Sequence, residues 1–176
     1  EWIKKQYAEG MMEKPGITVS RWIDGVMYPN DTIDQGPNLR AMVYWGHAPN
    51  SQTRGKDMVE AMKKLDLMVV IDPYPSATAA MANMAKTELA KAGGATGDVY
   101  LLPAATQYET SGSCTASNRS IQWRERVVSP LFEAQTDHAI MLAFARKFGF
   151  DKELTKNYKI VKPDANKMEE PEPESV

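Results

Sequence analysis

The sequence is poor in the residues that build metal centres and cross-links. Cys114 is the only cysteine among 176 residues, and His47 and His138 are the only histidines. One cysteine excludes an internal disulfide framework and any cysteine-based zinc or iron–sulfur site within this chain. Neither histidine is near Cys114 in the sequence, so a small loop residue is favoured there over a nucleophile. We expect no metal ligand and no catalytic residue in this chain.

Long apolar runs and a strong excess of charge are also absent. No run approaches the roughly 20 apolar residues of a membrane span, and the formal net charge of -2 gives no reason to expect a nucleic-acid partner. The sequence begins at Glu1, without an initiator methionine or a signal pattern. We therefore expect a processed chain or a piece of a longer one. With 43% hydrophobic residues it has the composition of a globular domain.

The regular part of the chain alternates between strand and helix patterns. Continuous apolar runs predict strands at 39–45, 66–72 and 98–104, and helical patterns fall between and after them. Continuous apolar strands joined by helices favour a parallel α/β sheet. The helices are expected at 53–65, 76–91 and 137–149.

The two ends of the chain have a different composition from its centre. Residues 1–38 are rich in Pro, Gly, Asp and Asn, and we expect an irregular connector there. The α/β domain is expected over 39–150. Residues 151–176 form a tail whose acidic, Pro-rich part after about 162 is expected to be disordered.

Ligands of open α/β sheets bind beyond the carboxyl ends of the strands. Gly46 lies at the first such end, where it fits a phosphate-binding turn or an ordinary strand–helix turn. Asp72 ends the second strand, where it fits an acceptor for ribose or guanine N–H groups or a turn-initiating residue before Pro73. Asp137 fits a ligand contact or a helix N-cap. The residues taken one at a time do not decide between the ligand-binding role and the structural role.

A polar segment, QYETSGSCTASNRSIQWRE (107–125), follows the third strand. Its Ser, Thr and Asn side chains suit either a surface loop or a loop around a large polar ligand. Glu109 and Arg119 are candidates for an ion pair that fixes its shape. The Trp123 side chain is suited either to cover a bound ligand or to pack against the protein.

Three stretches together resemble the large subunit of molybdenum- or tungsten-dependent formate dehydrogenases, within the bis-molybdopterin guanine dinucleotide oxidoreductases. They are WGHAPNSQTRG, LDLMVVIDPYPSAT and DVYLLPAATQYETSGSCTASNRSIQWRE, in that order. VYLLPAATQYETSGS is similar to the strand, LP and E-x-x-G-T/S pattern of the whole group, whereas SNRSIQWRE points toward formate dehydrogenase. The similarity runs from roughly Pro15 to Phe150.

The resemblance implies a Rossmann-like domain that binds the guanine dinucleotide end of one pterin cofactor. Relatives usually have G-x-N-P where this chain has Gly46-His47-Ala48-Pro49, so the resemblance implies that the asparagine contact is lost and that Asn50 or Ser51 replaces it. Thr110 sits where relatives often have lysine. The cofactor-binding residues that the resemblance implies are Gly46, His47, Asn50, Ser51, Ile71, Asp72, Thr110 and Asp137.

The resemblance covers only an internal portion of the catalytic subunit. It implies a parent that oxidises formate to carbon dioxide with molybdenum or tungsten, and that carries its iron–sulfur cluster outside this chain. The implied partners are the remaining portions of the subunit and an iron–sulfur electron-transfer subunit. We expect the chain to be inactive alone. Two alternatives remain: a segment of another enzyme of the group, such as a nitrate reductase, and a stand-alone nucleotide-binding or scaffold domain. The electron acceptor stays open, as does the compartment, where we favour the cytoplasm over the periplasm.

Overall fold

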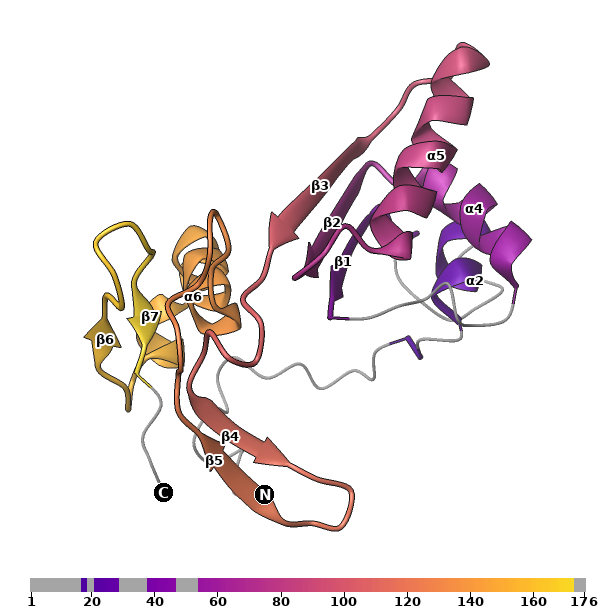
Figure 1. Cartoon of the computed structure of the whole chain (residues 1–176). Coiled ribbons are helices and arrows are strands. Elements are labelled where there is room, and N and C mark those ends of the chain that lie inside the picture. The colour runs from indigo at the N-terminus through magenta and orange to yellow at the C-terminus, as the bar shows by residue number, and fades with distance from the viewer. Residues whose placement is uncertain (1–16, 19–20, 29–37, 47–53, 173–176) are drawn as a thin grey trace. The chain divides into compact units, whose positions relative to one another are not determined.

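A computed structural model describes residues 17–18, 21–28, 38–46 and 54–172 of the chain (Figure 1). The chain divides into two compact units, Glu1–Leu102 and Pro103–Val176. The expected domain at 39–150 therefore extends over both units. Most of the expected connector at 1–38 lies outside the described residues; within it, a short helix α2 spans Trp22–Met27.

A three-stranded sheet organises the first unit. Its strands are β1 (Ala41–Trp45), β2 (Leu67–Asp72) and β3 (Asp98–Pro103), in the order β1-β2-β3. Strand β1 runs parallel to β2, with Ala41 opposite Leu67 and Trp45 opposite Ile71. Helices α4 (Gly55–Lys64) and α5 (Ala77–Lys91) form the two crossovers. The predicted parallel α/β fold is confirmed.

Both crossover helices cover the same face of this sheet (Figure 1). Right-handed crossovers between strands in sequential order require this arrangement. Helix α4 packs against both α5 and α2. Helix α5 begins at its N-cap Ser76, whose hydroxyl accepts a hydrogen bond from the Ala79 N–H.

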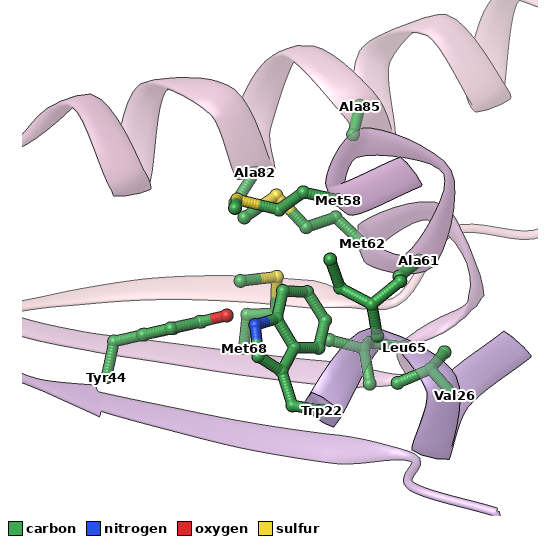
Figure 2. Close-up of a cluster of buried hydrophobic side chains, with 11 residues drawn as sticks. Trp22, Val26, Tyr44, Met58, Ala61, Met62, Leu65, Met68, Ala82 and Ala85 are labelled. Atoms are coloured by element: carbon green, nitrogen blue, oxygen red, sulfur yellow. The ribbon is translucent and has the colours of Figure 1, made fainter. Parts of the chain in front are cut away.

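The core of the first unit is built largely from methionine and alanine (Figure 2). Small alanines on α4 and α5 let these helices approach closely, and the unbranched methionines fill the spaces left between them and the sheet. The rings of Trp22 and Tyr44 close one side, edge to face, with their centroids 6.0 Å apart. The buried cluster comprises Trp22, Ile23, Val26, Tyr44, Met58, Ala61, Met62, Leu65, Met68, Ala82 and Ala85.

Truncating Met62 is expected to destabilise the first unit by about 2–5 kcal/mol, because its side chain is fully buried and alanine would leave a cavity. Urea denaturation of Met62→Ala measures the loss. Met84→Ala is the matched control: Met84 lies on α5 but is 48% exposed, so its truncation should change stability by less than about 0.5 kcal/mol. Equal losses in the two variants would contradict this description of the core.

The part of the second unit that the structure describes contains two short hairpins and two helices. Strands β4 (Gly112–Thr115) and β5 (Ile121–Arg124) pair antiparallel, as do β6 (Ile160–Val161) and β7 (Glu170–Pro171). Helix α6 spans Asp137–Phe148 and α7 spans Asp151–Leu154. Gly149 ends α6 with a left-handed backbone (φ 82°), as the sequence predicts.

The polar segment 107–125 forms the β4–β5 hairpin rather than an irregular loop. Part of its polarity is used inside the turn. The Asn118 carboxamide oxygen accepts hydrogen bonds from both the backbone N–H and the hydroxyl of Ser120, at 3.1 and 2.8 Å. Arg119 occupies a left-handed position there (φ 68°). These side chains therefore satisfy one another at an exposed turn.

The tail is more ordered than its composition predicts. The structure describes it through Glu172, including strand β7 and two buried charged side chains, Lys167 and Glu170. The Lys167 ammonium donates to the carbonyls of Phe132 (2.6 Å) and Ala134 (3.1 Å). The hydrogen bonds to these distant partners offset the conformational entropy lost when the polar segment becomes ordered. Amino-acid composition does not reveal such partners. Residues 173–176 lie outside the described part.

Candidate functional site

Three of the predicted cofactor-binding residues meet at the carboxyl edge of the sheet. The Gly46 N–H donates to the Ile71 carbonyl at 3.0 Å, which extends the β1–β2 ladder by one residue and brings Gly46 beside the end of β2. Gly46 has a left-handed backbone (φ 58°), and no described atom lies within 4 Å of the position that a Cβ would take. The described residues therefore leave space beside the Gly46 backbone. The Ile71 side chain itself is buried.

Asp72 fills the turn role that the sequence leaves open, and the ligand-acceptor role stays a prediction. One carboxylate oxygen, Oδ1, accepts the Tyr74 N–H at 3.0 Å and closes the turn before α5. Its second oxygen has no hydrogen-bond partner among the described residues. The side chain is partly exposed, so this oxygen can accept an N–H or O–H group from a ligand.

Three other predicted contacts, His47, Asn50 and Ser51, lie outside the described residues. Thr110 and Asp137 belong to the second unit. The Thr110 side chain is partly buried, and its hydroxyl donates to the Ser111 carbonyl at 3.4 Å. Asp137 opens α6, but it is not the N-cap: the Thr136 hydroxyl accepts the Ala139 N–H at 3.1 Å. The alternative assignment of Asp137 as the cap was wrong by one residue.

Glu109 holds the segment that carries Thr110. Its buried carboxylate accepts the backbone N–H groups of Thr106 (2.6 Å) and Leu131 (2.7 Å). The proposed Glu109–Arg119 ion pair does not form, since both carboxylate oxygens are used by backbone donors and Arg119 lies in the exposed hairpin turn. Glu109 thus joins two loops, which its sequence position did not indicate.

The second unit should lose stability in acid through Glu109. Burial raises the pKa of this carboxyl, but the hydrogen bonds from Thr106 and Leu131 and the charge of Lys167 together outweigh it, so the pKa lies below the ordinary value of 4.5. Its stabilising effect is therefore complete above pH 4.5 and is lost as the pH falls through the lowered pKa. Glu109→Gln, which turns one acceptor into a donor, should cost about 1–3 kcal/mol at pH 7.

Urea denaturation between pH 3 and 7 checks this prediction, and the Glu109→Gln variant should show a shallower pH dependence than the unmodified chain. Glu133→Gln, an exposed carboxyl on the neighbouring loop, serves as the control. If the stability of Glu109→Gln depended on pH as that of the unmodified chain does, Glu109 would not be the cause of the loss of stability in acid.

Within the described residues, no group of three or more His, Cys, Asp and Glu side chains is arranged to hold a metal ion. Cys114 lies exposed on β4. None of the described helices has the length and apolarity to cross a membrane.

A glycine turn and an acidic strand end at the carboxyl edge of a parallel sheet are typical of α/β proteins that bind dinucleotides. Residues 89–147 match the family model described as Molybdopterin oxidoreductase. Residues 89–147 therefore belong to a domain of this family.

Relatives of two kinds are similar to this chain. A trimethylamine-N-oxide reductase of Vibrio cholerae is 31% identical over 80% of the chain, and a dimethyl sulfoxide/trimethylamine N-oxide reductase of Rhodobacter capsulatus is 32% identical over 79%. An F420-dependent formate dehydrogenase subunit alpha of Methanocaldococcus jannaschii is 28% identical over 76%. The chain spans only 16% of the first two relatives and 18% of the third.

Proposed function

We propose that this chain holds the guanine dinucleotide end of a molybdopterin cofactor inside a larger oxidoreductase. The observation that carries the proposal is the grouping of Gly46, Ile71 and Asp72 at one edge of a parallel sheet. Two features support the proposal: the described residues leave space beside the Gly46 backbone, and the second oxygen of Asp72 is an acceptor for N–H or O–H groups. When bound, the cofactor supplies the redox chemistry through its metal.

The remaining contacts belong to the same proposal. His47, Asn50 and Ser51 would extend the Gly46 turn along the ligand. Thr110 and Asp137 lie in the second unit, where Glu109 and Thr136 hold their backbone in place, and they are proposed as cofactor contacts on the resemblance alone. All of these groups are neutral donors and acceptors or carboxylates, which suit a ligand rich in N–H and O–H groups.

Asp72→Asn is expected to weaken retention of the guanine dinucleotide at least about tenfold, because it replaces a charged acceptor with an amide. The measurement is the guanine nucleotide content of the purified full-length enzyme after acid extraction. Asp98→Asn is the control: Asp98 is exposed at the opposite end of the sheet. Equal guanine nucleotide content in Asp72→Asn, Asp98→Asn and the unmodified enzyme would refute the role of Asp72.

For the reaction, we propose formate oxidation, on the likeness of the β4–β5 segment SNRSIQWRE to formate dehydrogenases. A second candidate is reduction of trimethylamine N-oxide or dimethyl sulfoxide, which is favoured by the higher identity of the relatives with those names. An activity assay of the full-length enzyme distinguishes the two candidate reactions. Formate-dependent reduction of a viologen dye supports formate oxidation. Oxidation of reduced viologen by trimethylamine N-oxide or dimethyl sulfoxide supports the second candidate reaction. Metal analysis of the same preparation distinguishes molybdenum from tungsten and detects iron.

A further inference from the structure

Four large apolar side chains are exposed together in one loop of the second unit. They fall within residues 127–132, which we call the apolar loop. Single exposed apolar residues are common on protein surfaces, whereas a contiguous group of them marks an interaction site. The four residues, with their exposed fractions, are Val127 (71%), Val128 (48%), Leu131 (59%) and Phe132 (95%).

The start of the apolar loop is fixed by backbone hydrogen bonds. The N–H groups of Val127 and Val128 both donate to the Tyr108 carbonyl, at 2.9 and 3.2 Å. The order at this end of the loop therefore does not depend on packing of the two exposed valine side chains.

Two buried charged side chains hold the other end of the apolar loop. The Glu109 carboxylate accepts the Leu131 N–H at 2.7 Å, and the Lys167 ammonium donates to the Phe132 carbonyl at 2.6 Å. Hydrogen bonds that involve a charged group are among the stronger ones in proteins. The backbone of Leu131 and Phe132 is thus held firmly from the protein side, while both side chains remain exposed.

The backbone conformation of Phe132 is unusual for a residue with a large side chain. Its φ of 46° lies in the left-handed region, where a residue other than glycine is strained. A ring that is 95% exposed adds almost no packing to the second unit that would offset this strain. Strained backbone persists where the surroundings hold it, and it concentrates at functional positions. Phe132 is therefore placed for a contact outside the second unit.

The composition of the apolar loop defines the chemistry of its partner surface. Between Arg126 and Glu133 the loop carries no charged side chain. A partner gains by covering apolar surface there, and it would lose by burying its own charges. We propose that the apolar loop is an anchor that inserts Phe132 into an apolar pocket of the same enzyme polypeptide, outside residues 1–176. Because the loop is already ordered, this contact requires little further loss of conformational entropy.

The choice of the remaining polypeptide as the partner rests on the proposed function, a segment inside a larger oxidoreductase. The chain spans only 16% of the trimethylamine-N-oxide reductase of Vibrio cholerae, so most of that relative lies outside the matched segment. Parts of one polypeptide meet at a high effective concentration, without a bimolecular encounter. These two points favour the remaining polypeptide over a separate subunit, a second copy of the chain or a lipid surface.

Photo-cross-linking of the full-length enzyme tests which surface covers the apolar loop. The photoreactive residue p-benzoylphenylalanine replaces Phe132, so an aromatic side chain is kept and reacts on illumination with nearby C–H groups. Mass spectrometry of the digested product identifies the cross-linked peptide. We expect this peptide to come from the same polypeptide, outside residues 1–176, in a product with the mass of one chain. A cross-link only to residues 1–176, to another subunit, to a second copy or to lipid would overturn the proposal, as would the absence of any cross-link.

Phe132→Gly removes the ring, and glycine suits the left-handed backbone, so the apolar loop should keep its conformation. In the full-length enzyme, hydrogen exchange of the cross-linked partner peptide should accelerate about tenfold or more, because its apolar pocket loses its contact. Ile121→Ala is the control, since Ile121 is 66% exposed on β5 but lies outside the apolar loop. Unchanged exchange of the partner peptide in Phe132→Gly, or equal acceleration in Ile121→Ala, would contradict the role of Phe132 as the anchor.

The guanine nucleotide content of the same enzyme preparations separates this inference from the proposed function. If the enzyme retains guanine nucleotide but the apolar loop does not form the expected cross-link, the anchor is refuted and the proposed function stands. If the expected cross-link forms in an enzyme that holds no guanine nucleotide, the anchor is supported and the proposed function is refuted.

Discussion

Replacing Gly97 with alanine is expected to destabilise the first unit by about 3 kcal/mol or more. A Cβ at Gly97 would lie 2.1 Å from the backbone oxygen of Asp66 and 2.4 Å from its carbonyl carbon. Backbone atoms cannot rotate out of the way as a side chain can. The same Asp66 oxygen also accepts the Asp98 N–H at 2.9 Å, so moving the chains apart would break the contact that starts β3 beside β2.

Urea denaturation and hydrogen exchange over β2 and β3 measure this effect in Gly97→Ala. The matched control is Gly55→Ala at the start of α4, where nothing among the described residues lies within 4 Å of the added Cβ. That variant should be neutral or gain up to about 1 kcal/mol, since alanine favours helix over glycine. Similar behaviour of the two variants would refute the close approach at Gly97.

Replacing Glu170 with alanine is expected to destabilise the second unit by about 3–5 kcal/mol, the usual loss when one partner of a buried ion pair is removed. The Glu170 side chain is 3% exposed; it accepts hydrogen bonds from the Arg126 guanidinium and from the Thr136 hydroxyl. The same hydroxyl caps α6 through the Ala139 N–H. Loss of Glu170 therefore leaves a cation without its partner and loosens the start of α6.

The neighbouring residue gives the control for this second variant. Glu169 pairs with Arg146 at 2.7 Å, but both side chains are about half exposed, so Glu169→Ala should cost no more than about 1 kcal/mol. Hydrogen exchange in the first turn of α6 should accelerate in Glu170→Ala and stay unchanged in Glu169→Ala. Equal effects of the two variants would show that burial at Glu170 does not matter.

The elements of the first unit were predictable because they depend on local pattern. Continuous apolar runs gave all three strands within two residues of their observed bounds, and the helix expected at 76–91 is found at Ala77–Lys91. The carboxyl edge of the sheet could be placed for the same reason, since parallel topology brings strand ends together. Gly46 and Asp72 therefore emerged from the sequence as neighbours.

The second unit was harder to predict because its order depends on distant partners. The β4–β5 segment has few apolar residues, and its hairpin rests on hydrogen bonds in its turn as well as between its strands. The tail is acidic and rich in proline, yet Lys167 and Glu170 find their partners more than 30 residues away in the chain. The pocket lined by Trp123, His138 and Tyr158 likewise combines residues that are far apart in the sequence.

The sequence by itself determined the parallel α/β framework, the position of the glycine turn and the acidic strand end, because periodicity and turn chemistry are local properties of the chain. Only the tertiary structure decided which charged residues are buried. Lys86 is an example: it lies in an alanine-rich helix, yet it is buried and its ammonium group donates to the carbonyls of Lys63 and Leu65 at the end of α4. Burial of a charge depends on partners that folding brings together from distant parts of the chain, and these contacts leave no periodic signal in the sequence.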